Sequence, residues 1–272
     1  FYEDTLMLIR IIAFTLSLVA LSQHAYALRF YVNPETGDDR RSVRAAQDPA
    51  TPFKTITQAL RIAHLVPEKR PHVIQLTPST YSPSMGESFP LQISQSDIYV
   101  QVDGQATFDG ESKSNFFHIS SPTSEFLIKD IEFRNGLSEK GGVVYCNSCT
   151  LRVTNNRFFN NRSTEGGHLI YSDNGQLKFY NNLVRNNGID SDTLAVIDLR
   201  HTSADTSVRN EIRNNTFYRN PSTNIRTANT QTRISSNIFV GPEREAIRNA
   251  SDSATPFVGH NLFWQTETLY VS

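Results

Sequence analysis

The stretch Val153-Thr-Asn-Asn-Arg-Phe158 decides the fold, because related phrases recur along the second half of the chain. Each copy has an apolar residue, two mostly polar positions, Asn, one variable residue and then Phe or Val. The strong copies end at Phe158, Val184, Phe217, Phe239 and Phe263, and two weaker copies end at Phe108 and Phe133. The steps between successive end positions are 25, 25, 26, 33, 22 and 24 residues. Such a near-fixed period is typical of a solenoid, in which each unit buries its apolar face against its neighbours.

Apolar residues alternate with polar ones inside each unit, as in short strands with one buried face. Leu151 and Val153, for example, enclose Arg152. Leucine-rich repeats need Leu at fixed short spacings, and helical repeats show apolar residues three to four positions apart, so neither class fits. Short strands bounded by Asn, Gly, Ser and Asp predict an all-β fold: a right-handed single-stranded parallel β-helix with three strands per coil.

The repeated Asn is expected to be part of the scaffold. In a stack of coils, equivalent residues lie about 4.8 Å apart, so each carboxamide can donate to the next. The predicted ladder consists of Asn156, Asn182, Asn215, Asn237 and Asn261. The phenylalanines are expected to form a second ladder in the core, and the step of 33 residues predicts an insertion between Asn187 and Arg209 that leaves the stack as a loop.

Residues 7–27 have the features of a secretory signal peptide. Arg10 is the basic element, Ile11 to Leu21 is the apolar core, and Ala25-Tyr-Ala27 is the cleavage signal. The apolar core is too short to span a bilayer, so the mature chain is expected to have no transmembrane span. Residues 28–272 are then expected to form one β-helix domain in an oxidising compartment outside the cytoplasm.

The two ends of this domain differ. Residues 28–92 are expected to form an N-terminal cap and the first coil, and residues 93–272 the remaining coils. Thr55 and Gln58 fit a capping box, and Ile56, Leu60 and Ala63 share one helical face that can cover the apolar end of the stack. At the other end the chain stops as a strand in mid-coil, so we expect the natural protein to continue beyond Ser272.

Charge and cysteine content narrow the possible partners. The formal net charge of −1, from 26 basic and 27 acidic residues, argues against nucleic acid as a partner. Cys146 and Cys149 are the only cysteines. A local disulfide is the natural interpretation outside the cytoplasm, with free thiols and a metal site as the alternatives.

Several segments together resemble a known group of proteins. The segment Pro52-Phe-Lys-Thr-Ile-Thr-Gln-Ala-Leu60 with Thr80-Tyr-Ser82 is similar to an N-terminal domain of unknown function found on bacterial β-helices. The phrase His260-Asn-Leu-Phe-Trp264 resembles the last coils of secreted, pectin-lyase-like β-helix proteins, and Gly141-Gly142 resembles repeats of autotransporter passengers. The resemblance implies a secreted, extracellular or cell-surface protein, in the periplasm or outer membrane of a Gram-negative host. It also implies a polysaccharide or cell-surface glycan as partner.

A polysaccharide lyase of this fold needs a base and either Ca²⁺ or further basic residues that neutralise the uronate. The candidate catalytic residues are Lys178, Arg200 and His168. Asp173 and Asp198 are 25 positions apart, so they are expected to stack on adjacent coils and could hold Ca²⁺, the one cofactor considered. The alternative is that these are surface charges, with Arg200 paired to Asp198.

Two functions therefore remain open from the sequence. One is an exported rod that binds glycan, including an adhesin or autotransporter-like passenger. The other is a lyase that cleaves uronate polymers by β-elimination; the motifs of the hydrolases that share this fold are absent.

Overall fold

The computed structural model describes residues 28–66, 71–94, 98–120, 125–189, 194–241, 245–251, 253–266 and 268–271. The expected signal peptide, residues 7–27, lies outside this part of the chain. The side chains of residues 203–208 are likewise not described.

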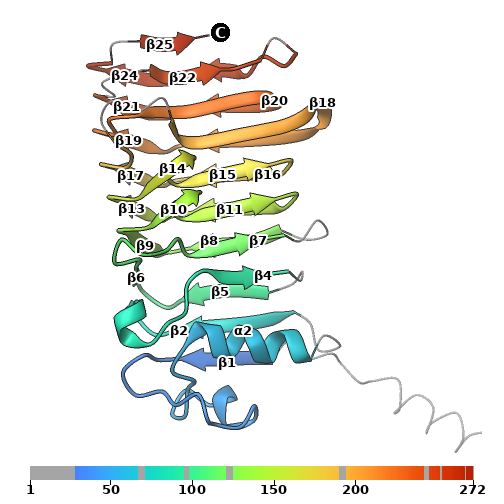
Figure 1. Cartoon of the computed structure of the whole chain (residues 1–272), viewed down its shortest axis with the longest axis vertical. Coiled ribbons are helices and arrows are strands. Elements are labelled where there is room, and N and C mark those ends of the chain that lie inside the picture. The colour runs from blue at the N-terminus through green and yellow to red at the C-terminus, as the bar shows by residue number, and fades with distance from the viewer. Residues whose placement is uncertain are drawn as a thin grey trace, which may run out of the picture.

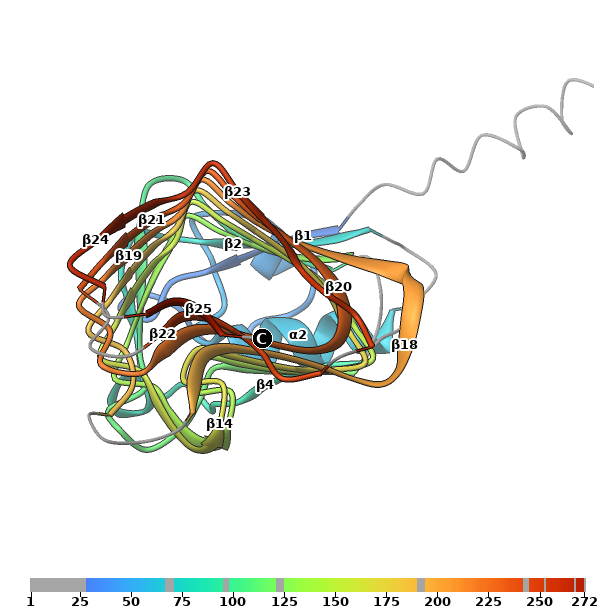
Figure 2. The ribbon, with the colours of Figure 1, turned by 90° about the horizontal axis from the view of Figure 1, so that it is seen from above.

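The described residues form a parallel β-solenoid whose coils stack along the long axis (Figure 1). Seen from above, each coil has three sides, which we call faces 1, 2 and 3 (Figure 2). Face 1 contains β1 (Leu28–Val32), β2 (His72–Leu76), β5 (Ile98–Val102), β8 (Glu125–Lys129), β12 (Thr150–Thr154), β16 (Gln176–Tyr180) and β23 (Phe257–Gly259). Face 2 is an eight-stranded sheet of β3 (Thr80–Tyr81), β6 (Ala106–Asp109), β9 (Ile131–Arg134), β13 (Arg157–Phe159), β17 (Leu183–Arg185), β19 (Thr216–Tyr218), β21 (Ile238–Val240) and β24 (Leu262–Trp264).

Face 3 completes the coil, and two long strands join it to face 1. It contains β4 (Leu91–Ile93), β7 (Phe117–Ile119), β11 (Val144–Asn147), β15 (Ile170–Asp173), β22 (Glu245–Asn249) and β25 (Thr268–Val271). The long strands β18 (Ala195–Arg213) and β20 (Thr223–Ser235) begin on face 3, turn the corner and end on face 1. The pairings on all three faces are parallel, so the predicted parallel β-helix, an all-β fold, is confirmed.

The 33-residue step is absorbed at that corner. Five positions separate Asp173 from Lys178, but eleven separate their partners on β18, Arg200 and Glu211. Six extra residues therefore lie at this corner, after Arg200, where β18 projects beyond the other coils (Figure 2). The sequence placed the insertion in the correct coil, and the structure puts most of it at one corner.

The interior is a continuous row of phenylalanine rings. Successive rings from Phe133 through Phe158, Phe179, Phe217 and Phe239 to Phe263 have centroids 4.9 to 6.3 Å apart. Val184 occupies the repeat position between Phe158 and Phe217, and there the ring of Phe179 from face 1 bridges the gap. Each fully buried aromatic side chain adds apolar burial between coils, which is the main stabilising term in a solenoid.

The five repeated asparagines do form a ladder. Oδ1 of each of the last four accepts a hydrogen bond from the backbone N–H of the ladder Asn one coil earlier, at 2.9 Å in each case, and Oδ1 of Asn156 accepts from the N–H of Ile131 at 3.0 Å. The residue before each ladder Asn has a positive φ, between 56° and 59°, which makes the sharp corner. A second ladder, of Asn161, Asn187 and Asn220, repeats this pattern at the other end of face 2.

The N-terminal region contains α2 (Ile56–Leu65) and two short 3-10 helices, η1 (Ala45–Gln47) and η2 (Pro83–Met85). Thr55 caps α2 by accepting from the N–H of Gln58 at 3.1 Å, and the carboxylate of Glu87 accepts from the N–H of Ile56 at 2.7 Å. The apolar side of α2 packs against β1, β2 and β4, and its role as a cap over the stack stays a prediction. No helix in the described ranges is long and apolar enough to cross a membrane.

Candidate functional site

The predicted residues Asp198 and Arg200 lie together on face 3. Nη2 of Arg200 is 2.7 Å from Oδ2 of Asp198, and Nη1 of Arg226 on the next coil is 2.9 Å from Oδ1. Only 1% of the Asp198 side chain is exposed, so two guanidinium groups share a buried carboxylate. The hydrogen bond to Asp198 raises the pKa of Arg200 above its ordinary value.

Asp173 does not stack on Asp198. The register pairs Asp173 with Arg200 and Tyr171 with Asp198, because this coil advances by 27 positions between β15 and β18 rather than by 25. The expected Ca²⁺ pair is therefore not formed at one register position. Among the residues that the structure describes, no group of three or more His, Cys, Asp and Glu could hold a metal ion.

Lys178 and His168 lie away from Arg200. Lys178 is on face 1, where its Nζ is 2.7 Å from Oε2 of Glu125, and Arg152 binds the other oxygen of Glu125 at 2.7 Å. His168 is fully buried, and its Nδ1 accepts from the N–H of Ser163 at 3.0 Å. One polymer unit therefore cannot contact Lys178, Arg200 and His168 together.

Cys146 and Cys149 form a disulfide with an S–S distance of 2.03 Å. Both cysteines are buried, Cys146 in β11 and Cys149 in the turn that links β11 to β12. This bond is part of the scaffold at the corner between faces 3 and 1.

A groove opens on face 3 below the Asp198 cluster. A two-stranded parallel ladder of β10 (Leu137–Lys140) and β14 (Arg162–Gly166), which we call the β10–β14 wall, stands beside this face (Figure 1), and its strand β10 lines the groove. The pocket between β10 and the strands β7 and β11 has a volume of about 460 Å³. The polar and aromatic side chains that line it include Lys113, Asn115, His118, Lys140 and Tyr145.

An aromatic row forms one side of this groove and extends above it. His118, Tyr145 and Tyr171 are register partners on three successive coils, with ring centroids 5.7 and 5.9 Å apart. Lys140 from the wall and Arg200 from β18 lie over the ring of Tyr171, at 5.4 and 5.0 Å from its centroid. The row thus passes from half-exposed rings at His118 and Tyr145 to a ring covered by cations at Tyr171.

Hydrogen bonds and burial hold this arrangement in place. Asn115 donates to the carbonyl of Gly141 at 3.0 Å and so ties the base of the wall to the coil below. Burial lowers the pKa of His118 below its ordinary value, which favours the neutral imidazole. A neutral imidazole beside exposed rings and amines can accept a hydrogen bond or a proton from a bound ligand.

This row was not among the predicted site residues. His118, Tyr145 and Tyr171 are 27 and 26 positions apart, close to the coil period, so the signal was present in the spacing of aromatic residues. The repeated phrase did not reveal this spacing, because the phrase leads into face 2 and does not fix the register of face 3.

Comparison with known proteins identifies a family but no characterised relative. No curated protein matches the chain significantly. No solved structure matches it significantly either. The family described as "Protein of unknown function (DUF1565)" matches residues 36–190, more than half of the chain and including the groove, and the chain belongs to this family.

Proposed function

We propose that the protein is an exported β-helix protein that binds polysaccharide in the groove between face 3 and the β10–β14 wall. The observation that carries the proposal is the pair of half-exposed rings of His118 and Tyr145 in the groove, which the ring of Tyr171 continues above it. Sugar rings have apolar C–H faces that pack on aromatic rings, and their hydroxyl groups need nearby polar partners. Lys113, Asn115 and Lys140 supply such partners in the same pocket.

Export is supported by two separate features. Residues 7–27 read as a signal peptide, and the Cys146–Cys149 disulfide is the state that cysteines keep in an oxidising compartment. A rigid rod with a lateral groove suits a cell-surface or extracellular protein, which includes an adhesin-like role. Fractionation of the native host tests the location: recovery in the cytoplasm with an uncleaved N-terminus would contradict export.

The binding test compares two tyrosines on different faces. Tyr145→Ala removes the half-exposed ring in the groove, and Tyr218→Ala removes a half-exposed ring on face 2 as the matched control. In affinity electrophoresis against a panel of neutral and acidic polysaccharides, we expect Tyr145→Ala to weaken binding about tenfold, the loss typical of one stacked aromatic ring. The control should bind like the unmodified protein. No retardation by any polymer, or equal losses in the two variants, would contradict the proposal.

A polysaccharide lyase is the second candidate, and the His118–Tyr145 pair favours it. The two rings meet edge to face with centroids 5.7 Å apart, in a pocket that a polymer can reach. In β-elimination the imidazole would take the C5 proton of a uronate, the C–H electrons would form the C4–C5 double bond, and the C4–O bond would break. The Tyr145 hydroxyl would protonate the leaving oxygen.

Ultraviolet absorbance of the unsaturated product separates the two candidates. A rise on pectate, alginate or a glycosaminoglycan that His118→Ala abolishes would establish the lyase. Binding without any rise would leave the groove as a binding site alone.

A further inference from the structure

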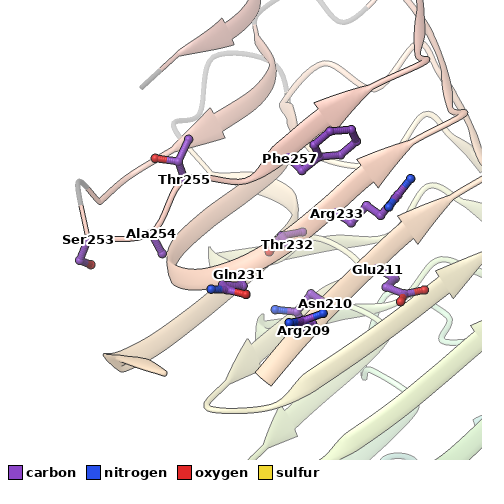
Figure 3. Close-up of a pocket in the computed structure, with 10 residues that line it drawn as sticks. All are labelled: Arg209, Asn210, Glu211, Gln231, Thr232, Arg233, Ser253, Ala254, Thr255 and Phe257. Atoms are coloured by element: carbon purple, nitrogen blue, oxygen red, sulfur yellow. The ribbon is translucent and has the colours of Figure 1, made fainter. Parts of the chain in front are cut away.

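A second pocket lies on face 1, in coils that follow those of the groove along the chain. Its volume is about 550 Å³. Figure 3 shows side chains from β18, β20 and β23 and from the loop before β23 around it. Its lining residues with charged, amide or aromatic groups are Arg209, Asn210, Glu211, Gln231, Arg233 and Phe257.

The pocket carries two exposed arginines, Arg209 and Arg233. Within the described residues, neither Arg209 nor Arg233 forms an ion pair, and both are exposed. The register pairs Arg209 with Gln231 and Glu211 with Arg233, so the two arginines are diagonal neighbours on adjacent strands. Strand spacing and rise put their Cα atoms roughly 8 Å apart, within reach of one ligand group for two long side chains.

Glu211, the one acidic residue lining this pocket, is engaged elsewhere. Its Oε2 accepts from the hydroxyl of Tyr180 at 2.5 Å and pairs with Arg213, which is not a lining residue. The bond from Tyr180 lowers the pKa of Glu211, and Arg213 compensates its charge. The pocket therefore presents a positive potential to solvent.

The ring of Phe257 suits an organic ligand rather than a bare ion. It is 53% exposed and, with Ala254, offers an apolar wall beside the guanidinium of Arg233, which lies 5.0 Å from the ring centroid.

We propose that this face 1 pocket is a second ligand site, in which Arg209 and Arg233 bind the oxyanion group, a carboxylate or sulfate, of an acidic saccharide. That the ligand is a saccharide rests on the proposed function. That it is anionic follows from the two arginines. Guanidinium groups bind carboxylate and sulfate with charge-assisted, often bidentate, hydrogen bonds. The protein would then hold an acidic polymer on two faces of the rod.

Calorimetric titration in the Tyr145→Ala background isolates this pocket, because the groove is weakened there. The probes are a galacturonate trimer, its methyl ester as the neutral match, and a sulfated galactose trimer. We expect one or both acidic trimers to bind and the methyl ester to bind at least about tenfold more weakly. Arg209→Gln and Arg233→Gln should each reduce affinity for the acidic trimer about tenfold, and the double variant further. Raising NaCl from about 50 to about 500 mM should weaken binding of the acidic trimer to the Tyr145→Ala protein more than to the protein that also carries both arginine substitutions.

Arg185→Gln is the matched control, because Arg185 is also exposed and lies over a ring, that of Tyr218 on face 2. Arg233→Lys keeps the charge and reports on the bidentate geometry if a glutamine variant fails to fold. Equal affinity for the ester and the acid, or an unchanged affinity in the double variant, overturns the inference. The groove proposal is tested separately: it fails if Tyr145→Ala does not affect polysaccharide binding.

Discussion

Asn182 and Asn215 are 33 positions apart, yet Nδ2 of Asn182 donates to Oδ1 of Asn215 at 3.1 Å. The same Nδ2 donates to the carbonyl of Val153 at 3.0 Å, and Oδ1 of Asn182 accepts from the N–H of Asn156 at 2.9 Å. One carboxamide thus joins three coils. The ladder continues across the coil with the long insertion, which shows that the corner absorbs the extra residues without disturbing the opposite turn.

Replacement of Asn182 by Ala should therefore be strongly destabilising. It leaves the buried Asn156 N–H and the Val153 carbonyl without partners, each of which costs about 1–3 kcal/mol. We expect the free energy of unfolding in urea, followed by circular dichroism, to fall by at least about 2 kcal/mol. Asn147→Ala, at an exposed position of β11, is the control and should change it by less than about 0.5 kcal/mol. Equal effects would show that the ladder does not stabilise the coils.

The repeat made the fold and the first ladder predictable because both depend on one phrase at one corner. The second ladder could also have been predicted from the sequence, since each of its residues follows the end of a repeated phrase by three positions. These residues are Asn161, Asn187 and Asn220. The site was not predictable in the same way. Faces 1 and 3 are joined to the phrase by turns of variable length, so a spacing of 25 placed Asp173 on Asp198 when the true partner was Tyr171.

Loss of the Asp198 carboxylate should destabilise face 3. Asp198→Ala leaves Arg200 and Arg226 facing each other without the anion that holds both. Removing one partner of a buried ion pair lowers the free energy of unfolding by about 3–5 kcal/mol. Because the two arginines are partly exposed, we expect a smaller loss here, of about 2–3 kcal/mol. Thermal and urea unfolding measure the loss.

Glu165→Gln serves as the comparison for Asp198. Glu165 is 54% exposed and lies 3.8 Å from Lys140, so its removal should cost less than about 0.5 kcal/mol. A loss for Asp198→Ala no larger than this would mean that the two arginines are adequately solvated without the carboxylate.

Tyr81 should make the fold sensitive to alkali. Its hydroxyl lies 3.1 Å from the Val32 carbonyl and 3.0 Å from that of Thr77, and burial raises its pKa to about 12. In the unfolded chain the phenol ionises near pH 10, so above this pH the folded state retains a proton that the unfolded state has lost. The contribution is fully present below about pH 10 and is lost towards about pH 12, at about 1.4 kcal/mol per pH unit.

Tyr81→Phe isolates this effect among the other tyrosines. The variant lacks the ionisable group, so the stability difference between it and the unmodified protein should shrink as pH rises from about 9 to about 12. Urea titrations at each pH provide the measurement, and Tyr218→Phe, at a half-exposed position, is the control. A difference that stays constant with pH would show that Tyr81 ionises normally.

Gly166 links the wall of the groove to its aromatic row. A Cβ at this position would lie 2.9 Å from two ring carbons of Tyr171 and 3.3 Å from Oδ2 of Asp198. Contacts under 3 Å to a ring held by Arg200 force the wall outward, because the ring cannot turn aside without breaking the stack. Gly166→Ala should therefore widen the groove and weaken polysaccharide binding about three- to tenfold, with a stability loss of about 1–3 kcal/mol. Thr164→Ala changes an exposed residue of the same strand, β14, and should leave both quantities unchanged. If Gly166→Ala loses stability but binds with full affinity, the wall does not contribute to the binding site, and the ligand contacts the sheet alone.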